Sequence, residues 1–375
     1  MTAPFRLYGA ELSPYSIKVR SYLRYKGVEF EWLSRSQARQ EEFARYAKLP
    51  LIPVLVDAED NALQDSTPMI EKLEAEYAEP SIMPAEPALA FISALLEDYA
   101  DEWLNKAMFH YRWTYPDDQE SAASRIAAAI FEGAEKPEGI EESVRTRMIG
   151  RLYHVGSSPE TAALIEGSFT RVLHLVEELL KRRPYLLGGR PSLADFGLAC
   201  QFAQLLSDPT PGAIIRAQAP NVVAWVERME HPKAEGEFAS LAEVRGALSE
   251  LLRTEVAGAY LAWMAANAAA VAEDANGVAV EIAGTMFTQK PQRYAAKAYA
   301  ELQRKREAVD DEALAALLEE TGCDAYLKAE RDEDDDGEDV EAEAETVAET
   351  SAEAGDNGAD EAADDDEASE QERDA

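Results

Sequence analysis

The sequence predicts an α/β domain followed by an all-helical region. Short strand-like runs alternate with helical patterns over residues 1–79, and Pro80, Pro84 and Pro87 then mark a linker. After the linker the strand pattern nearly vanishes and long helical periodicities take over. This change in periodicity indicates two domains of different architecture, and 375 residues are enough for both cores.

The first domain is expected to run strand, helix, strand, strand pair and helix, which is a thioredoxin-like arrangement. Its first helix ends at Gly27, a typical C-terminal stop, and turn residues Glu59 to Asn61 indicate a hairpin. The expected strands are 6–8, 28–33, 54–56 and 62–63, and the expected helices are 14–26 and 67–77, with a short helix or loop at 37–48.

The remaining chain is expected to be mostly helical. Ser192 and Asp195 have capping-box spacing, which indicates a helix start. Val278, Val280 and Ile282 alternate in a way that favours a small hairpin. Helices are expected at 88–115, 160–182, 192–206, 221–230, 241–272, 291–307 and 310–320, with an insertion at 116–158. The expected domains are 1–79, a linker at 80–87, a helical domain at 88–239, a helical extension at 240–328 and a tail at 329–375.

The formal net charge of −37 is concentrated at the C-terminal end. Residues 331–375 carry 22 acidic and 2 basic side chains and have no aromatic residue, so we expect a disordered acidic tail. The tail either keeps the protein in solution or docks on a basic partner. The rest of the chain is also acidic, which argues against nucleic acid or an anionic membrane as a partner.

Location is inferred from what the chain does not contain. No apolar run has signal-peptide or membrane-spanning length, and Cys200 and Cys323 are far apart in the sequence. A reduced, cytoplasmic protein is the expectation.

Three short signals in the first domain outline a site for a thiol. In Ser13-Pro14-Tyr15-Ser16, the proline suits the first position of a helix and Ser13 falls at the N-cap, where the helix dipole stabilises an anion. In Leu51-Ile52-Pro53-Val54 a proline precedes a strand, and Asp65-Ser66 opens a further helix. Each signal also has a purely structural explanation, as a helix cap, a turn or a helix start.

In this order the three signals resemble the glutathione transferase family, of a serine type or an unassigned bacterial-like class. The stretch from Pro184 to Asp195 is similar to the start of a core helix in that family's second domain. The resemblance implies that Ser13 activates the glutathione thiol, that Ile52 and a cis Pro53 present backbone to the peptide, and that Asp65 and Ser66 hold the γ-glutamyl group. The sequence departs from the family in the approach to Pro53, which lacks a glycine, and in Asp65, which is shorter than the usual Glu.

Several assignments stay open. Tyr8 and Tyr15 are rivals to Ser13 as the donor to the thiolate. Tyr99 and Trp103 lie four residues apart and either line a second-substrate pocket or pack in the core. The acidic pairs Glu97/Asp101 and Asp98/Glu102 lack histidine partners, and the four histidines form no ligand motif, so no metal is expected.

The sequence therefore supports two functions. The first is a glutathione transferase that uses glutathione as co-substrate and conjugates it to a small apolar electrophile, as a homodimer by family resemblance. The second is a non-catalytic interaction protein of the same fold, acting through its extension and acidic tail.

Overall fold

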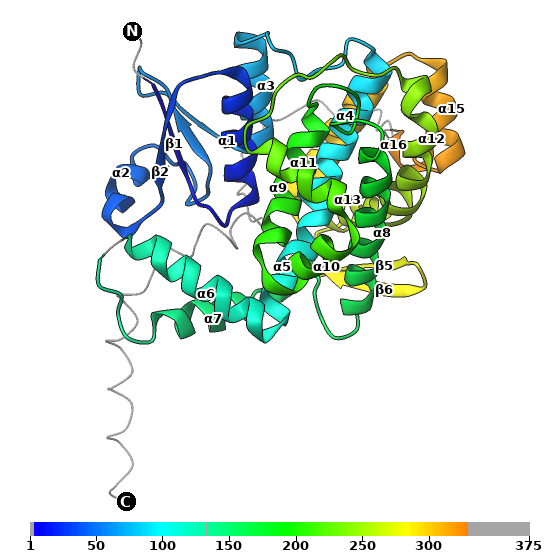
Figure 1. The fold of residues 1–375 in the computed structure, drawn as a ribbon. Helices are drawn as coiled ribbons and strands as arrows, with labels where there is room; N and C mark the ends of the chain where they lie inside the picture. The colour runs from blue at the N-terminus through cyan, green and yellow to red at the C-terminus, as the bar shows by residue number, and fades with distance from the viewer. Residues whose placement is uncertain (1–3, 133, 329–375) are drawn as a thin grey trace, which may run out of the picture.

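The computed structural model describes residues 4–132 and 134–328, and the predicted acidic tail lies outside these residues. Figure 1 shows a small domain with a sheet on one side and a larger helical body on the other. Helix α1, Pro14–Lys26, lies between the sheet and the helical body, and α4, Pro87–Tyr99, is the first helix of that body. The fold class is the one that the sequence predicts: a thioredoxin-like domain, an all-helical domain and a mostly helical extension.

The first domain is built on a four-stranded sheet with the order β2-β1-β3-β4. β1 runs parallel to β2 and antiparallel to β3, and β3 pairs with β4 as the predicted hairpin. Leu7 and Leu55 pack in the main core with α1 and α3, whereas Tyr8, Val54 and Val56 pack in a second core with Phe43 of α2. The elements are β1 Phe5–Gly9, α1 Pro14–Lys26, β2 Phe30–Ser34, a 3₁₀ turn Gln37–Arg39, α2 Gln40–Ala44, β3 Val54–Val56, β4 Ala62–Gln64 and α3 Ser66–Glu76.

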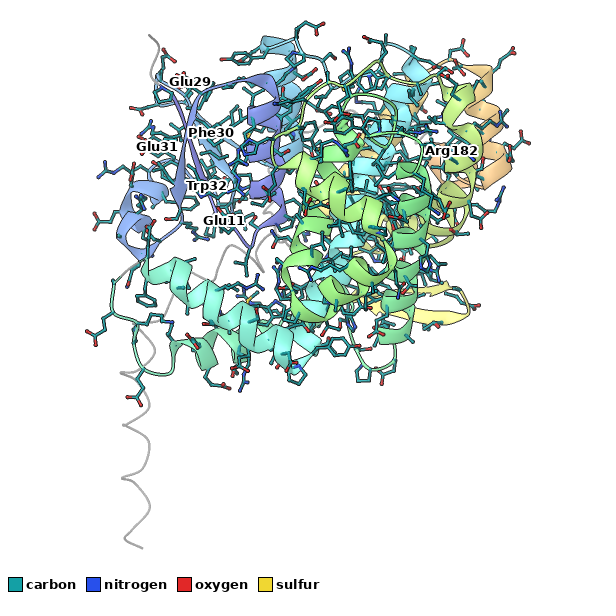
Figure 2. The ribbon with its side chains drawn as sticks, viewed as in Figure 1. Glu11, Glu29, Phe30, Glu31, Trp32 and Arg182 are labelled. Atoms are coloured by element: carbon teal, nitrogen blue, oxygen red, sulfur yellow. The ribbon has the colours of Figure 1, made fainter. Side chains whose placement is uncertain are left out.

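Strand β2 is an edge of this sheet. Figure 2 labels Glu29, Phe30, Glu31 and Trp32 along and just before it, on the side of the molecule away from the labelled Arg182. Glu29 and Glu31 are exposed, and charged side chains on an edge strand discourage pairing with another chain.

The helical domain contains the predicted helices and three that the patterns do not predict: α6 and α7, which lie in the expected insertion at 116–158, and α10. The capping box of Ser192 and Asp195 is confirmed: Ser192 N donates to Asp195 Oδ2 at 2.9 Å at the start of α9. The predicted helix 88–115 is α4, a π-helical segment and α5 in continuous sequence. The elements are α4 Pro87–Tyr99, π-helix Ala100–Leu104, α5 Asn105–Thr114, α6 Pro116–Phe131, α7 Ile140–Ile149, a 3₁₀ turn Leu152–Val155, α8 Ala162–Leu180, α9 Leu193–Ser207, α10 Pro209–Gln218 and α11 Pro220–Met229.

The extension packs on α4, α5 and α8. The Tyr260 hydroxyl donates to Asp98, and Arg171 Nε donates to Glu255 Oε1 at 2.6 Å. The predicted hairpin is present, with Val280 opposite Phe287. The elements are α12 Leu241–Leu251, π-helix Leu252–Leu261, α13 Ala262–Ala272, β5 Val278–Ile282, β6 Thr285–Gln289, α14 Arg293–Glu307, α15 Glu312–Thr321 and α16 Asp324–Leu327.

Two further observations concern the whole described chain. Within residues 4–132 and 134–328, no helix has both the length and the apolar character needed to cross a membrane. Cys200 and Cys323 are both buried, and neither forms a disulfide bond.

Candidate functional site

A pocket of about 910 Å³, including its open mouth, lies between the first domain, helix α5 and the extension. The pocket brings together five residues that the sequence singles out: Tyr15, Ile52, Pro53, Asp65 and Ser66. The pocket also contains two leucines and six polar or charged residues that the sequence does not assign to a glutathione site. The six are Lys48, Gln64, Asp101, Glu102, Asn105 and Tyr294.

The Pro53 loop offers free backbone to the pocket. The Ile52–Pro53 peptide bond is cis, and the N–H and C=O of Ile52 bond to no other described residue. Gln64 holds the loop in place, because its amide donates to the carbonyls of Leu49 at 2.8 Å and Leu51 at 2.7 Å and accepts from Leu49 N at 3.1 Å. The Gln64 amide therefore braces a loop that lacks the family's glycine, and leaves Ile52 as an open backbone edge.

Asp65 and Ser66 lie at the start of α3. Asp65 has φ +82°, a conformation that a non-glycine residue rarely adopts and that turns the chain sharply into the helix. Asp65 Oδ2 accepts a hydrogen bond of 2.6 Å from the hydroxyl of Tyr294, which belongs to α14 of the extension. Burial raises the pKa of the Asp65 carboxyl, and the hydrogen bond from Tyr294 opposes that rise.

Lys18 links this helix start to α4. Its buried ammonium lies 2.6 Å from Asp101 Oδ2 and 2.9 Å from Thr67 Oγ1, pairs with Glu97, and reaches Ser66 Oγ at 3.4 Å. Burial alone lowers the pKa of Lys18, but Asp101 and Glu97 outweigh it and hold the pKa above its usual value. The Lys18 ammonium thus lies between the carboxylates of Glu97 and Asp101, which are four residues apart in the sequence.

Metal ligation has no geometric support in the part of the chain that is described. Within residues 4–132 and 134–328, no group of three or more His, Cys, Asp or Glu side chains is arranged to hold a metal ion.

The three predicted thiol donors occupy different positions. Ser13 caps α1, as predicted, and its Oγ accepts from Ser16 N at 3.3 Å; the residue is 0% exposed and does not line the pocket. Tyr8 points to the second core and donates to Glu42 at 2.6 Å. Tyr15 lines the pocket, where its hydroxyl donates to the Asp101 carbonyl at 3.1 Å and accepts from Asn105 Nδ2 at 3.2 Å.

Tyr99 and Trp103 lie in the core, and neither lines the pocket. Tyr99 packs edge-on against Tyr260, and Trp103 Nε1 donates to Ser168 Oγ at 2.9 Å. The spacing of four assumes α-helical geometry, but the chain is π-helical from Ala100 to Leu104. A π-helix has a wider turn and rotates the faces, so Asp101, Glu102 and Asn105 reach the pocket instead.

These three residues form what we call the acidic wall: Asp101, Glu102 and Asn105. Asp101 Oδ1 and Asn105 Oδ1 are buried with no hydrogen-bond partner among the described residues. Glu102 is 6% exposed, and no described residue bonds to its carboxylate. Burial, reinforced by the nearby Asp98, raises the pKa of Glu102 well above its usual value.

A segment of each domain matches a protein-family model. Residues 7–81 match the model for the glutathione S-transferase N-terminal domain, and residues 159–228 match the model for the glutathione S-transferase C-terminal domain. The two models cover neither the acidic wall nor the extension.

Named relatives have low sequence identity. The isoprene-epoxide–glutathione S-transferase of Rhodococcus sp. (strain AD45) is 25% identical over 230 residues, which are 58% of this chain and 92% of that protein. Glutathione S-transferase 3 of Zea mays is 26% identical over 234 residues, which cover 60% of this chain and 88% of that protein. Among solved structures, a glutathione S-transferase from Rhodospirillum rubrum F11 aligns with 78% of this chain and 99% of its own, at 20% identity and a TM-score of 0.42.

Proposed function

Because the chain belongs to the glutathione S-transferase family, we propose that it binds reduced glutathione in the pocket and transfers it to a small electrophile. The observation that supports this most directly is the position of the open Ile52 backbone beside Asp65 and Ser66 in one pocket. A peptide backbone and an amino-acid head group would find complementary partners there.

Each part of glutathione has a matching group. The N–H and C=O of Ile52 pair with the cysteinyl backbone, as in a short strand pair. The hydroxyl of Ser66, which accepts from Lys18, donates its own proton to the γ-glutamyl carboxylate, and Asp65 accepts from the γ-glutamyl ammonium. Lys48 is the cation that lines the pocket and suits the glycyl carboxylate.

The thiol is activated at the N-terminus of α1. A thiol with a pKa near ~8.5 is mostly protonated at neutral pH, and lowering that value by ~2 units requires about 2.7 kcal/mol in favour of the thiolate. The helix N-terminus and one hydroxyl donor are together of this size. Ser13 stays the predicted donor by family resemblance, but Ser13 is buried and its rival Tyr15 lines the pocket. To donate to the sulfur, the Tyr15 hydroxyl must turn its proton away from the Asp101 carbonyl.

In the transfer step the glutathione sulfur forms a bond to an electrophilic carbon. The bond from that carbon to its leaving group, or to the ring oxygen of an epoxide, breaks, and its electron pair stays with the departing atom. The thiol proton passes to solvent, and an epoxide oxygen takes a proton from water. The homodimer and the cytoplasmic location remain predictions.

Calorimetric titration with reduced glutathione tests the proposal. We expect saturable binding by the wild-type chain and at least tenfold weaker binding by Ser66→Ala, because the γ-glutamyl carboxylate loses a donor. Ser249→Ala, on α12 and outside the pocket, is the matched control and should bind as wild type does. No binding by folded protein at millimolar glutathione would reject the proposal and leave the non-catalytic interaction protein as the better account.

A further inference from the structure

The acidic wall is a second polar surface in the same pocket, and the proposed glutathione contacts do not use it. Asp101, Glu102 and Asn105 are 8%, 6% and 1% exposed, and all three line the pocket. Two buried acceptors, Asp101 Oδ1 and Asn105 Oδ1, have no hydrogen-bond partner among the described residues, and the Glu102 carboxyl lines the same pocket. A buried acceptor without a donor is costly, so this surface is suited to a ligand that brings several donors or a positive charge.

No ion pair forms to Glu102 within the described residues. Lys18 is already shared between Glu97 and Asp101 Oδ2. The charge of Lys106 acts to lower the pKa of Glu102, but Lys106 makes no contact with that carboxylate: its Nζ donates to Gln289 Oε1 at 3.0 Å and lies 3.7 Å from the centre of the Trp263 ring. Among the described residues, two carboxylates therefore share one ammonium, and a third lines the pocket without a direct ion pair.

The acidic wall adjoins the end of the pocket where the thiol would lie. Asn105 donates to the Tyr15 hydroxyl, and that hydroxyl donates to the carbonyl of Asp101. Tyr15 lies in the first turn of α1, which is the helix whose N-terminus is proposed to hold the sulfur. A group bound against the part of the wall beside Tyr15 would lie next to the reacting atom.

We propose that the acidic wall recognises the second substrate, and that this substrate is a small electrophile bearing a quaternary ammonium or protonated amine. The inference rests on the proposed glutathione-transferase function and changes the expected substrate class from apolar to cationic. The positive group lies against Glu102 and Asp101, where its charge counteracts the burial that raises the pKa of Glu102 and so favours the ionised carboxylate. An electrophilic carbon a few bonds away meets the sulfur. Ring opening or displacement follows the same bond changes as for any other electrophile.

A pair of epoxides of equal shape tests the proposal: glycidyltrimethylammonium and its neutral carbon isostere, 2-neopentyloxirane. With glutathione and the full chain at pH 8, we expect kcat/KM, corrected for each uncatalysed rate, to favour the cation at least tenfold. In Glu102→Gln, which keeps the side-chain shape and removes the charge, the ratio should fall toward one. Ser249→Ala, on α12 and outside the pocket, should leave the preference intact.

A binding measurement covers the case in which neither epoxide is turned over. The two S-substituted glutathiones that the epoxides would form are titrated against wild type and Glu102→Gln, with glutathione as the reference. Tighter binding of the cationic product in wild type alone supports the proposal. Equal binding of both products, beside normal glutathione binding, overturns the cationic substrate and leaves the proposed function intact.

Two other results would also be decisive. If Glu102→Gln weakens binding of glutathione itself tenfold, the acidic wall serves the γ-glutamyl ammonium, and the proposal is wrong. If the wild-type chain binds no glutathione or product, the proposed function fails, and the proposal that rests on it fails too.

Discussion

The two sides of the pocket differ in how completely their polar groups are satisfied. On the Pro53 side, Gln64 makes three hydrogen bonds to the loop, and the free groups are the backbone of Ile52. On the side of the π-helical segment, buried acceptors on Asp101 and Asn105 lack donors. The first side lies within residues that match the family's N-terminal domain, and the second lies outside both matched domains.

This difference separates what is shared from what is specific. Under the proposed function, the side that belongs to the matched N-terminal domain would hold glutathione. The side outside both matched domains, whose buried acceptors are unpaired among the described residues, is where the second substrate would be selected. The contrast can be tested at the residue that joins the two sides, at the thiol end, and at the extension.

Lys18 joins the two sides, and its removal should have the largest effect. Lys18→Met leaves Glu97 and Asp101 buried without a cation, so we expect a loss of about 3–5 kcal/mol in the free energy of unfolding. Urea denaturation measures this loss. Lys305→Met removes a partly exposed pair with Glu71 and should cost only about 1 kcal/mol or less.

A compensated variant distinguishes lost charge from lost volume. Adding Glu97→Gln and Asp101→Asn to Lys18→Met should recover much of the stability, because no charge is then left buried and unpaired. Equal destabilisation by Lys18→Met and Lys305→Met would show that the two sides are not joined by a buried ion pair.

Tyr15 is the next test, at the thiol end. Losing one hydrogen bond to a charged sulfur costs about 1.5–3 kcal/mol, so Tyr15→Phe should lower kcat by roughly 10- to 100-fold. Ser13→Ala should lower stability through the lost helix cap, by about 1 kcal/mol, with a smaller effect on kcat. Steady-state rates and thermal unfolding of both variants are compared. A larger loss of kcat in Ser13→Ala would return the thiol contact to Ser13.

Tyr294 should have the smallest effect and a distinctive pH dependence. Asp65 must be ionised to hold an ammonium, so glutathione affinity falls as the pH drops through the raised pKa of Asp65. Tyr294 opposes that rise in pKa, as does Lys18, while Glu97 adds to it. Tyr294→Phe should therefore weaken glutathione binding about three- to tenfold and shift the loss of affinity to higher pH.

The control for this prediction is Tyr77→Phe, a change at the exposed tyrosine that directly follows α3. Glutathione affinity of all three proteins is measured from pH 5 to 8. A uniform weakening of binding by Tyr294→Phe at every pH would indicate that Tyr294 only supports the fold.

The sequence predicts the features that depend on neighbours in the chain. The cap at Ser13, the helix start at Ser66 and the capping box at Ser192 are each encoded within a few residues, and each is found. The cis Pro53, which the family resemblance implies, is found as well. Tyr294 could not be predicted, because it lies 229 residues from the carboxylate it bonds and carries no local motif.

The spacing of Tyr99 and Trp103 leaves a pocket and the core open, and the structure has the core packing. A pattern of apolar residues predicts a helix but does not distinguish α from π geometry, and the chain is π-helical from Ala100 to Leu104. Asp101 and Glu102 stand out in the sequence only as members of acidic pairs, and Asn105 carries no motif, whereas the structure buries all three. Burial of charged side chains depends on contacts that the local sequence does not show.

The hydrogen bond between Tyr294 and Asp65 joins the proposed glutathione site to α14 of the extension. If glutathione binds best when α14 is docked, its measured affinity is the intrinsic affinity scaled by the fraction of molecules in the docked state. By linkage, glutathione must then favour docking to the same degree. Amide hydrogen exchange across Arg293–Glu307 would slow when glutathione binds, and a substitution anywhere along the docked surface would change affinity without touching the ligand.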